Sequence, residues 1–113
     1  MTPAGAMAAT RFDTVLIIDD HPLFCDALAM TLRAVAGAGR VEAAHRLGEA
    51  LDRIDAGARP DLAVLDLHLP DVDGIGGLLR LRAAAPAMPV VVVSSMADDR
   101  VIAAAMAAGA AGF

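Results

Sequence analysis

Three apolar segments, each followed by polar residues, decide the fold. They are Val15-Leu16-Ile17-Ile18 before Asp19-Asp20, Leu62-Ala63-Val64-Leu65 before Asp66, and Val90-Val91-Val92-Val93 before Ser94-Ser95. Short runs of this kind, rich in β-branched residues and without polar alternation, predict strands buried on both faces, in a parallel sheet covered by helices. In such sheets ligands bind at the carboxyl ends of the strands. We therefore expect three strands to bring three carboxylates and a hydroxyl to one edge.

The rest of the chain predicts helices that alternate with strands. Helices are expected over 22–36, 47–56, 75–85 and 98–108, and further strands over 40–44 and from 111 onward. In the first helix, Leu23, Ala27, Met30 and Val35 follow near-helical spacing and predict its apolar face. Asp98 and Asp99 suit the positive end of the last helix. The order of elements predicts an α/β fold with a doubly wound parallel sheet and right-handed crossovers.

Composition narrows the class of protein. A chain of 113 residues corresponds to one domain. The net charge is −5, and the nine basic residues are all arginine, without the basic stripe of a nucleic-acid surface. A single cysteine excludes an internal disulfide, and no apolar run is long enough to predict a membrane span or a signal peptide. We expect a cytoplasmic protein whose residues 1–13 form a flexible lead.

The acidic edge has a definite chemistry. Asp19, Asp20 and Asp66 repel one another when close, and a divalent ion with oxygen ligands, such as Mg²⁺, relieves that repulsion. A carboxylate beside such an ion can accept a phosphoryl group as an acyl phosphate. Asp66 is the expected acceptor because it stands alone at the end of the central run. The acidic pair would hold the metal, and Ser94 could donate a hydrogen bond to a phosphoryl oxygen.

These segments resemble the receiver domains of two-component response regulators. The resemblance extends over residues 14–113 and is strongest to the subgroup whose receivers precede a helix-turn-helix DNA-binding domain (the LuxR, NarL and FixJ type). It rests on four segments in the family's order: residues 17–24 (IIDDHPLF), 65–74 (LDLHLPDVDG), 89–94 (PVVVVS) and 109–113 (GAAGF), with Asp66 inside the second. It implies a flavodoxin-like sheet of strand order 2-1-3-4-5, here with an incomplete fifth strand and no fifth helix.

The resemblance also implies roles for individual residues. Asp66 would take a phosphoryl group from a histidine kinase or phosphotransfer protein. Asp20 and Asp66 would bind Mg²⁺ directly, Asp19 through water, and His68 through its backbone carbonyl. Ser94 matches the family's hydroxyl switch and Phe113 its aromatic switch, so that phosphorylation would change a signalling surface.

Such a domain is a signalling module and not an enzyme. Its implied role is to control transcription, and DNA would be bound only through an output domain that lies outside these residues. A homodimer is a possible partner state, and no membrane is implicated. The kinase, the stimulus and the target genes are not encoded in these motifs.

One position departs from the family. Receivers have a lysine three residues after the aromatic, which here would be position 116, and the chain contains no lysine at all. The chain is therefore expected to be either a fragment of a longer protein or a truncated receiver. The alternative function is a degenerate receiver that binds a protein partner independently of phosphorylation.

Other readings of these motifs have weaker support. A haloacid-dehalogenase-like phosphatase would need an acid two residues after the nucleophile, where this chain has His68. A nucleotide- or flavin-binding domain would need a glycine-rich loop after the first strand, where Asp19 and Asp20 would instead repel a phosphate. His21, His45 and His68 lack metal-ligand spacing to one another and are expected to face solvent or to cap helices.

Overall fold

A parallel sheet forms the centre of the molecule, in a computed structural model that describes residues 12–94 and 99–113. Its strands are β1 (Thr14–Ile18), β2 (Arg40–Ala44), β3 (Leu62–Asp66) and β6 (Val90–Val93). They lie in the order β2-β1-β3-β6, and every pair is parallel. The predicted doubly wound α/β sheet is confirmed. Most of the predicted lead, residues 1–11, lies outside the described residues.

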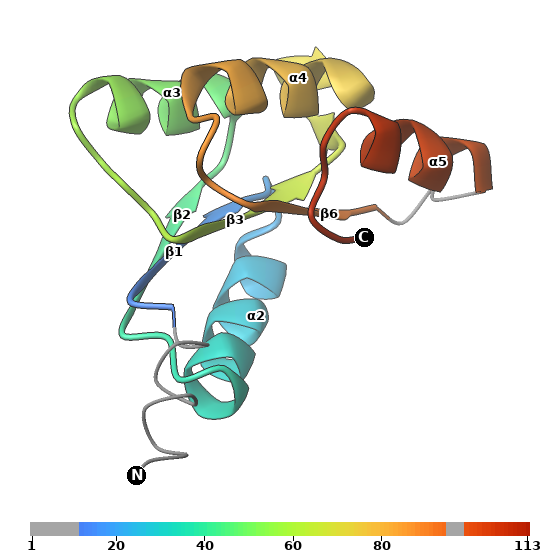
Figure 1. Ribbon diagram of the computed structural model, residues 1–113. Helices are drawn as coiled ribbons and strands as arrows, with labels where there is room; N and C mark the ends of the chain where they lie inside the picture. The colour runs from blue at the N-terminus through green and yellow to red at the C-terminus, as the bar shows by residue number, and fades with distance from the viewer. Residues whose placement is uncertain (1–11, 95–98) are drawn as a thin grey trace, which may run out of the picture.

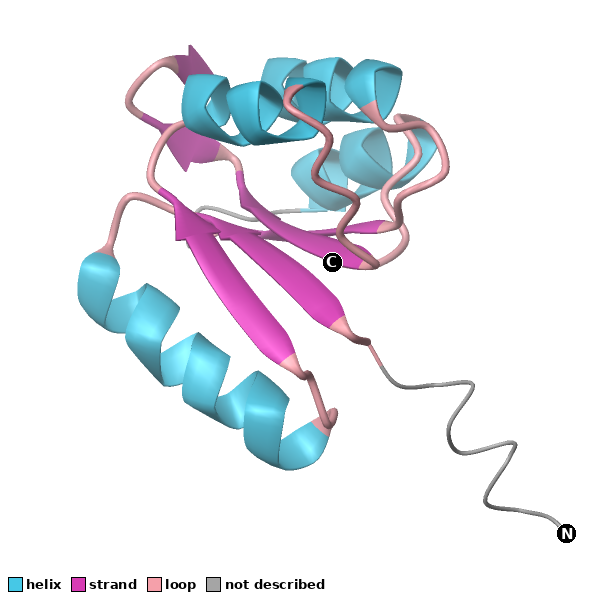
Figure 2. Ribbon diagram, turned by 90° about the vertical axis from the view of Figure 1, so that its left-hand side faces the viewer, coloured by secondary structure: helices cyan, strands magenta, loops and turns pink. Residues whose placement is uncertain are grey.

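Four helices cover the two faces of the sheet. Helix α2 (Pro22–Val35) lies against one face, whereas α3 (Leu47–Asp55), α4 (Ile75–Ala84) and α5 (Asp99–Ala107) lie on the other (Figures 1 and 2). Each helix agrees with its predicted range to within about two residues. Asp99 begins α5, while Asp98 lies outside the described residues. No helix within the described ranges is long and apolar enough to cross a membrane.

A fifth strand begins at the end of the chain. Gly112 forms a parallel bridge with Val91 of β6. The Ala111 N–H donates to the Val90 carbonyl (2.7 Å), and the Val92 N–H donates to the Gly112 carbonyl (2.9 Å). This pairing extends the sheet beyond β6, as the predicted order 2-1-3-4-5 requires.

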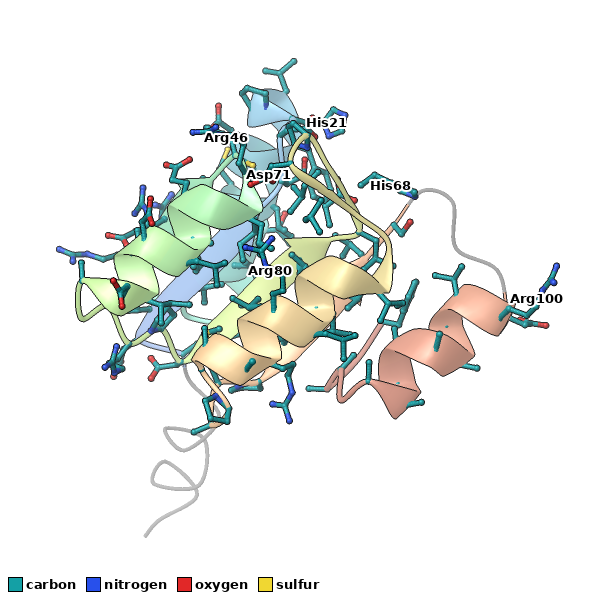
Figure 3. The ribbon with its side chains drawn as sticks, turned by 90° about the horizontal axis from the view of Figure 1, so that it is seen from above. His21, Arg46, His68, Asp71, Arg80 and Arg100 are labelled. Atoms are coloured by element: carbon teal, nitrogen blue, oxygen red, sulfur yellow. The ribbon has the colours of Figure 1, made fainter. Side chains whose placement is uncertain are left out.

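A short hairpin was not predicted. Strands β4 (His68–Leu69) and β5 (Val72–Asp73) pair antiparallel in residues 67–74, for which the sequence predicted neither a helix nor a strand. Two-residue strands are too short to produce a detectable period in the sequence. The hairpin places Asp71 at its turn, where the carboxylate reaches the start of α3 (Figure 3). Asp71 Oδ1 accepts the Leu47 N–H (2.9 Å) and Oδ2 accepts the Gly48 N–H (2.8 Å).

The core has two parts because side chains alternate across the sheet. The larger part lies under α3, α4 and α5 and contains Leu16 and Ile18 of β1, Leu65 of β3 and Leu78 of α4. The smaller part lies under α2 and contains Val15 from β1, together with Leu62 and Val64 from β3. Strands buried on both faces were predicted from the unbroken apolar runs, and this arrangement confirms them.

The predicted apolar face of α2 is wrong. Leu23, Met30 and Val35 are 84%, 69% and 82% exposed. The helix packs instead through buried Cys25 and partly buried Leu28 and Leu32, in part against the smaller core. The helix is rich in alanine, leucine and methionine on every side, so its periodicity alone could not select the buried face.

Candidate functional site

Strand order and register bring the acidic residues together. β1 and β3 are neighbours, and Ile18 pairs with Leu65, so Asp19 and Asp66 each follow a paired residue at the same edge. Asp66 in turn pairs with Val93 of β6, after which Ser94 leaves the sheet. The predicted convergence at the carboxyl edge is therefore present in the structure.

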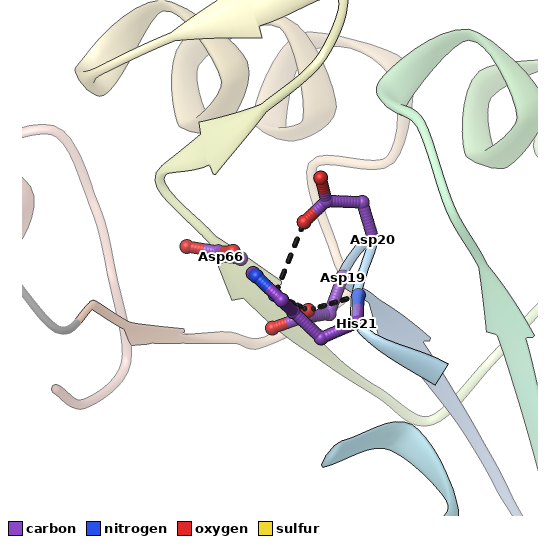
Figure 4. A group of neighbouring side chains, drawn as sticks. All are labelled: Asp19, Asp20, His21 and Asp66. Atoms are coloured by element: carbon purple, nitrogen blue, oxygen red, sulfur yellow. Dashed lines mark hydrogen bonds and ion pairs between the residues drawn. The ribbon is translucent and has the colours of Figure 1, made fainter. Parts of the chain in front are cut away.

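Four side chains gather at this edge, and we call them the acidic cluster: Asp19, Asp20, His21 and Asp66 (Figure 4). Each offers one ligand atom, and these atoms all lie within 4.8 Å of one another. Asp19 and Asp66 are buried, with 4% and 7% of their surfaces exposed. Asp20 and His21 face solvent more, so the cluster has a buried floor and an open mouth.

The environment of Asp66 disfavours its charged form. Burial is the main cause that raises the pKa of this carboxyl, and repulsion from Asp19 and Asp20 adds to it. The His68 N–H donates to Asp66 Oδ1 (3.0 Å) and partly offsets the increase. A cation bound at the cluster would lower the pKa of Asp66, because a nearby positive charge favours the ionised carboxylate.

Asp20 contributes an oxygen that lacks a hydrogen bond. Its Oδ1 is enclosed, and no residue that the structure describes donates a hydrogen bond to it, although His21 Nδ1 lies 3.1 Å away. An enclosed carboxylate oxygen without a donor costs free energy unless a cation compensates it. The donor set of three carboxylates therefore fits a hard divalent ion such as Mg²⁺.

His21 was expected to face solvent or cap a helix, and its contacts show a closer connection with the acidic pair. Its side chain is 70% exposed, yet Nδ1 donates to Asp19 Oδ1 (2.7 Å), and its backbone N–H donates to the same oxygen (2.8 Å). The hydrogen bond to Asp19 is the largest cause that raises the pKa of His21, followed by the charge of Asp20. The spacing of the three histidines could not predict this contact, because His21 pairs with the carboxylates just before it in the chain and not with another histidine.

The backbone of Asp19 is held by residues of β2, of α2 and of the turn that follows β2. Its N–H donates to the Ala44 carbonyl at the end of β2 (3.0 Å). Its carbonyl accepts from His45 Nδ1 (3.0 Å) and from the Cys25 thiol of α2 (3.4 Å). His45 and Cys25 thus position the segment that presents the acidic pair, a role that the sequence did not reveal for either residue.

A cavity of about 500 Å³ opens over the cluster. It is lined by Asp19, His21, Phe24, Asp66, Val93 and Ser94. Ser94, the expected hydroxyl switch, is therefore one of the residues at this cavity. Phe113 is 39% exposed and is not among the residues that line this cavity. His68 lies two residues beyond Asp66 and contacts it through its N–H, whereas its predicted role concerns its carbonyl.

Comparisons with known proteins identify the family of the chain. The family model described as "Response regulator receiver domain" matches residues 15–113. The "Glycerol metabolism activator" of Pseudomonas putida is 39% identical over 99 residues, which are 88% of this chain and 45% of that protein. A "Protein-glutamate methylesterase/protein-glutamine glutaminase 2" of Anaeromyxobacter dehalogenans is 37% identical over 81 residues, 72% of this chain and 23% of that protein.

Solved structures share the fold. A LuxR family DNA-binding response regulator from Silicibacter pomeroyi superposes with a TM-score of 0.76 at 35% identity, covering 88% of this chain and 75% of that one. A response regulator protein from Burkholderia pseudomallei, described with a phosphorylated aspartic acid, calcium ion and citrate, has a TM-score of 0.76 at 27% identity. It covers 88% of this chain and 57% of that one.

The chain belongs to the receiver domain family of two-component response regulators, and its fold is CheY-like. It spans about half the length, or less, of the curated relatives that it matches. Those relatives include transcriptional regulators and methylesterases, so the receiver is the part that all of them share with this chain.

Proposed function

We propose that residues 14–113 form a receiver unit that takes a phosphoryl group onto Asp66 and relays that state to an output. The observation that supports it best is the convergence of Asp19, Asp20 and Asp66 at one sheet edge, with an enclosed oxygen of Asp20 that lacks a donor. The donor would be a phosphohistidine of a kinase or phosphotransfer protein.

The transfer is a single displacement at phosphorus. A carboxylate oxygen of Asp66 forms the new P–O bond while the P–N bond of the phosphohistidine breaks, and the departing imidazole nitrogen keeps the electron pair and takes a proton from solvent. The cavity over Asp66 admits a phosphoryl group from the open side. The His68 N–H remains on Asp66 Oδ1 and orients the attacking carboxylate.

Mg²⁺ is the proposed cofactor. Asp20 and Asp66 would hold it directly, with Asp19 through water and His68 through its carbonyl. When bound, the ion neutralises charge on the phosphoryl group and on the cluster. Ser94 would donate to a phosphoryl oxygen after transfer, and Phe113 would turn inward as the surface switches.

The output is proposed from the relatives. Two Mycobacterium tuberculosis relatives are named as a transcriptional regulatory protein and a DNA-binding transcriptional activator, which favours control of transcription in the cytoplasm through a separate output domain. A homodimer of receivers is a further proposed state. The methylesterase relatives carry the same receiver with a different output, so the receiver alone does not specify which output it regulates.

Incubation with acetyl phosphate and Mg²⁺, followed by intact-mass spectrometry, tests the acceptor. We expect a gain of one phosphoryl group in the wild-type chain and none in Asp66→Asn, which keeps the shape of the side chain. Asp61→Asn is the matched control at the opposite edge of β3, and it should be labelled. Labelling of Asp66→Asn at the wild-type level would contradict the assignment.

Asp20→Ala tests the metal site separately. Loss of this carboxylate should weaken Mg²⁺ binding at least severalfold, because few protein ligands hold the ion. Isothermal titration calorimetry measures the change, and Asp52→Ala on the exposed surface of α3 serves as control. An unchanged Mg²⁺ isotherm for Asp20→Ala would remove Asp20 from the site.

The degenerate-receiver alternative makes a different prediction for the same experiments. A degenerate receiver would bind Mg²⁺ at the acidic cluster but would take no phosphoryl group from acetyl phosphate. Mg²⁺ binding without labelling of the wild-type chain would therefore favour a phosphorylation-independent interaction module.

A further inference from the structure

Helix α2 carries an apolar stripe on the side that faces away from the sheet. We define the stripe as Leu23, Ala27, Met30 and Ala34, whose spacings of four, three and four residues place them on one side of a helix. All four are exposed, Leu23 and Met30 by 84% and 69%. The helix is alone among the described helices on its face of the sheet (Figure 2). A continuous exposed stripe of this kind is typical of an interaction surface.

The stripe alternates long and small side chains, which makes it complementary to a second copy of itself. In an antiparallel pair of α2 helices related by a two-fold axis, Leu23 would lie opposite the partner's Ala34. Met30 would lie opposite the partner's Ala27. Each long side chain would then pack over a small one, so the two helices could approach closely. A parallel pair would instead set long side chains against each other and leave the alanines facing one another.

The charges beside the stripe are complementary in the same antiparallel orientation. Asp26 and Arg33 are one heptad apart and so lie on the same flank of the helix, where both line a cavity of about 300 Å³ between α2 and β2. They are about 10 Å apart along the helix, too far to pair within one chain. Neither side chain forms an ion pair with another residue that the structure describes. The two-fold axis would bring each Asp26 within reach of the partner's Arg33, which gives two ion pairs.

We propose that the stripe on α2 binds a second copy of this chain, in an antiparallel helix pair flanked by the ion pairs between Asp26 and Arg33. The contact is the same on both copies, so it closes as a dimer. Each copy contributes one helix of 14 residues, a smaller contact than a standard interface, and the dimer is therefore weak and concentration-dependent. The inference assigns a surface to the homodimer proposed above, and it does not depend on phosphoryl uptake.

Charge exchange tests the orientation of the pair. Sedimentation equilibrium of the chain, from about 10 μM to about 1 mM and without a phosphoryl donor, should show a monomer–dimer equilibrium in the wild type. Asp26→Arg and Arg33→Asp should each weaken the dimer at least about fivefold, because the two-fold axis turns two attracting pairs into two repelling ones. The double variant, which exchanges the two charges, should recover the wild-type dissociation constant to within about threefold. Circular dichroism checks that each variant is folded.

Met30→Glu tests the apolar part of the contact and should weaken the dimer at least about tenfold, because it places a charge at the centre of the stripe. Leu79→Glu is the matched control, since Leu79 is 54% exposed on α4, across the sheet from α2. Its dissociation constant should stay within about twofold of the wild type. A wild-type chain that remains monomeric up to about 1 mM, or a folded double variant that does not recover, would overturn the inference. Normal dimerisation without phosphoryl labelling would contradict only the proposed function.

Discussion

At the scale of single residues, Asp66 illustrates how a functional group opposes stability. It is 7% exposed and shares its surroundings with Asp19 and Asp20. Burial and like charge raise its pKa, which means that the folded state disfavours the ionised carboxylate. The three carboxylates of the acidic cluster therefore repel one another, and the proposed cation would relieve that repulsion.

Asp66→Asn should stabilise the metal-free protein by about 1 kcal/mol or more, because it removes one buried charge from a repelling group. The Asn carbonyl can still accept the His68 N–H. Urea unfolding at pH 7 with a chelator, followed by circular dichroism, measures the difference. As a control, Asp52→Asn at an exposed position of α3 should change the free energy of unfolding by less than about 0.5 kcal/mol. A less stable Asp66→Asn variant would show that the buried charge is already compensated.

The sequence predicted the carboxylates at this scale but not their neighbours. Asp19, Asp20 and Asp66 follow from strand ends in a parallel sheet, which is a topological rule. The contacts of His21 and His45 depend on side-chain rotamers and on the path of the β1–α2 segment, and neither leaves a periodic signal. The sequence therefore predicted which carboxylates converge, whereas the hydrogen bond from His21 Nδ1 to Asp19 became apparent only in the three-dimensional structure.

At the scale of elements, Asp71 links a hairpin turn to the start of α3. Its two carboxylate oxygens accept the Leu47 and Gly48 N–H groups, which lack partners inside the helix. The residue before the helix, Arg46, provides no side-chain cap. A cap supplied from 24 residues away could not be recognised in the sequence, because capping rules consider adjacent residues.

Asp71→Ala should lower the free energy of unfolding by about 1 kcal/mol at neutral pH, the typical effect of losing an N-cap. These hydrogen bonds lower the pKa of Asp71 below its ordinary value of 3.8. The stabilisation is therefore present above the pKa of the unfolded chain and is lost as pH falls through the lower, folded pKa.

Urea unfolding at pH 6 and at pH 2 measures both effects. The difference in free energy of unfolding between wild type and Asp71→Ala should be smaller at pH 2 than at pH 6. The control Asp52→Ala, on the surface of α3, should differ little from wild type at either pH. A difference that stays constant across this range would mean that Asp71 acts through something other than its charge.

At the scale of the whole molecule, the two sheet faces are unequally covered. Three helices enclose the larger core cluster, while α2 alone covers the smaller one (Figure 2). The unbroken apolar runs of β1 and β3 made the two-sided burial predictable. The wrong prediction for α2 shows the limit of this reasoning, since a helix with apolar residues on more than one face can turn any of those faces to the sheet.

The larger cluster should dominate stability. Leu81 of α4 is fully buried, and Leu81→Ala should cost about 2–5 kcal/mol, a large fraction of the stability of a typical domain. Leu79, two residues earlier on the same helix, is 54% exposed, and Leu79→Ala should cost less than about 1 kcal/mol. Chemical denaturation of both variants measures the contrast. Equal costs would contradict the assigned face of α4.

The register of β1 against β3 gives the acidic cluster a second use, as a gauge of strand alignment. One residue advances a strand by about 3.3 Å and turns its side chain to the other face of the sheet. The ligand atoms span no more than 4.8 Å, so a slip of one position would separate Asp19 from Asp66. Circular dichroism would scarcely detect such a misaligned sheet. Under the proposed function, a loss of Mg²⁺ affinity would report such a slip, so a Mg²⁺ titration would serve as an assay of correct pairing in any variant of this chain.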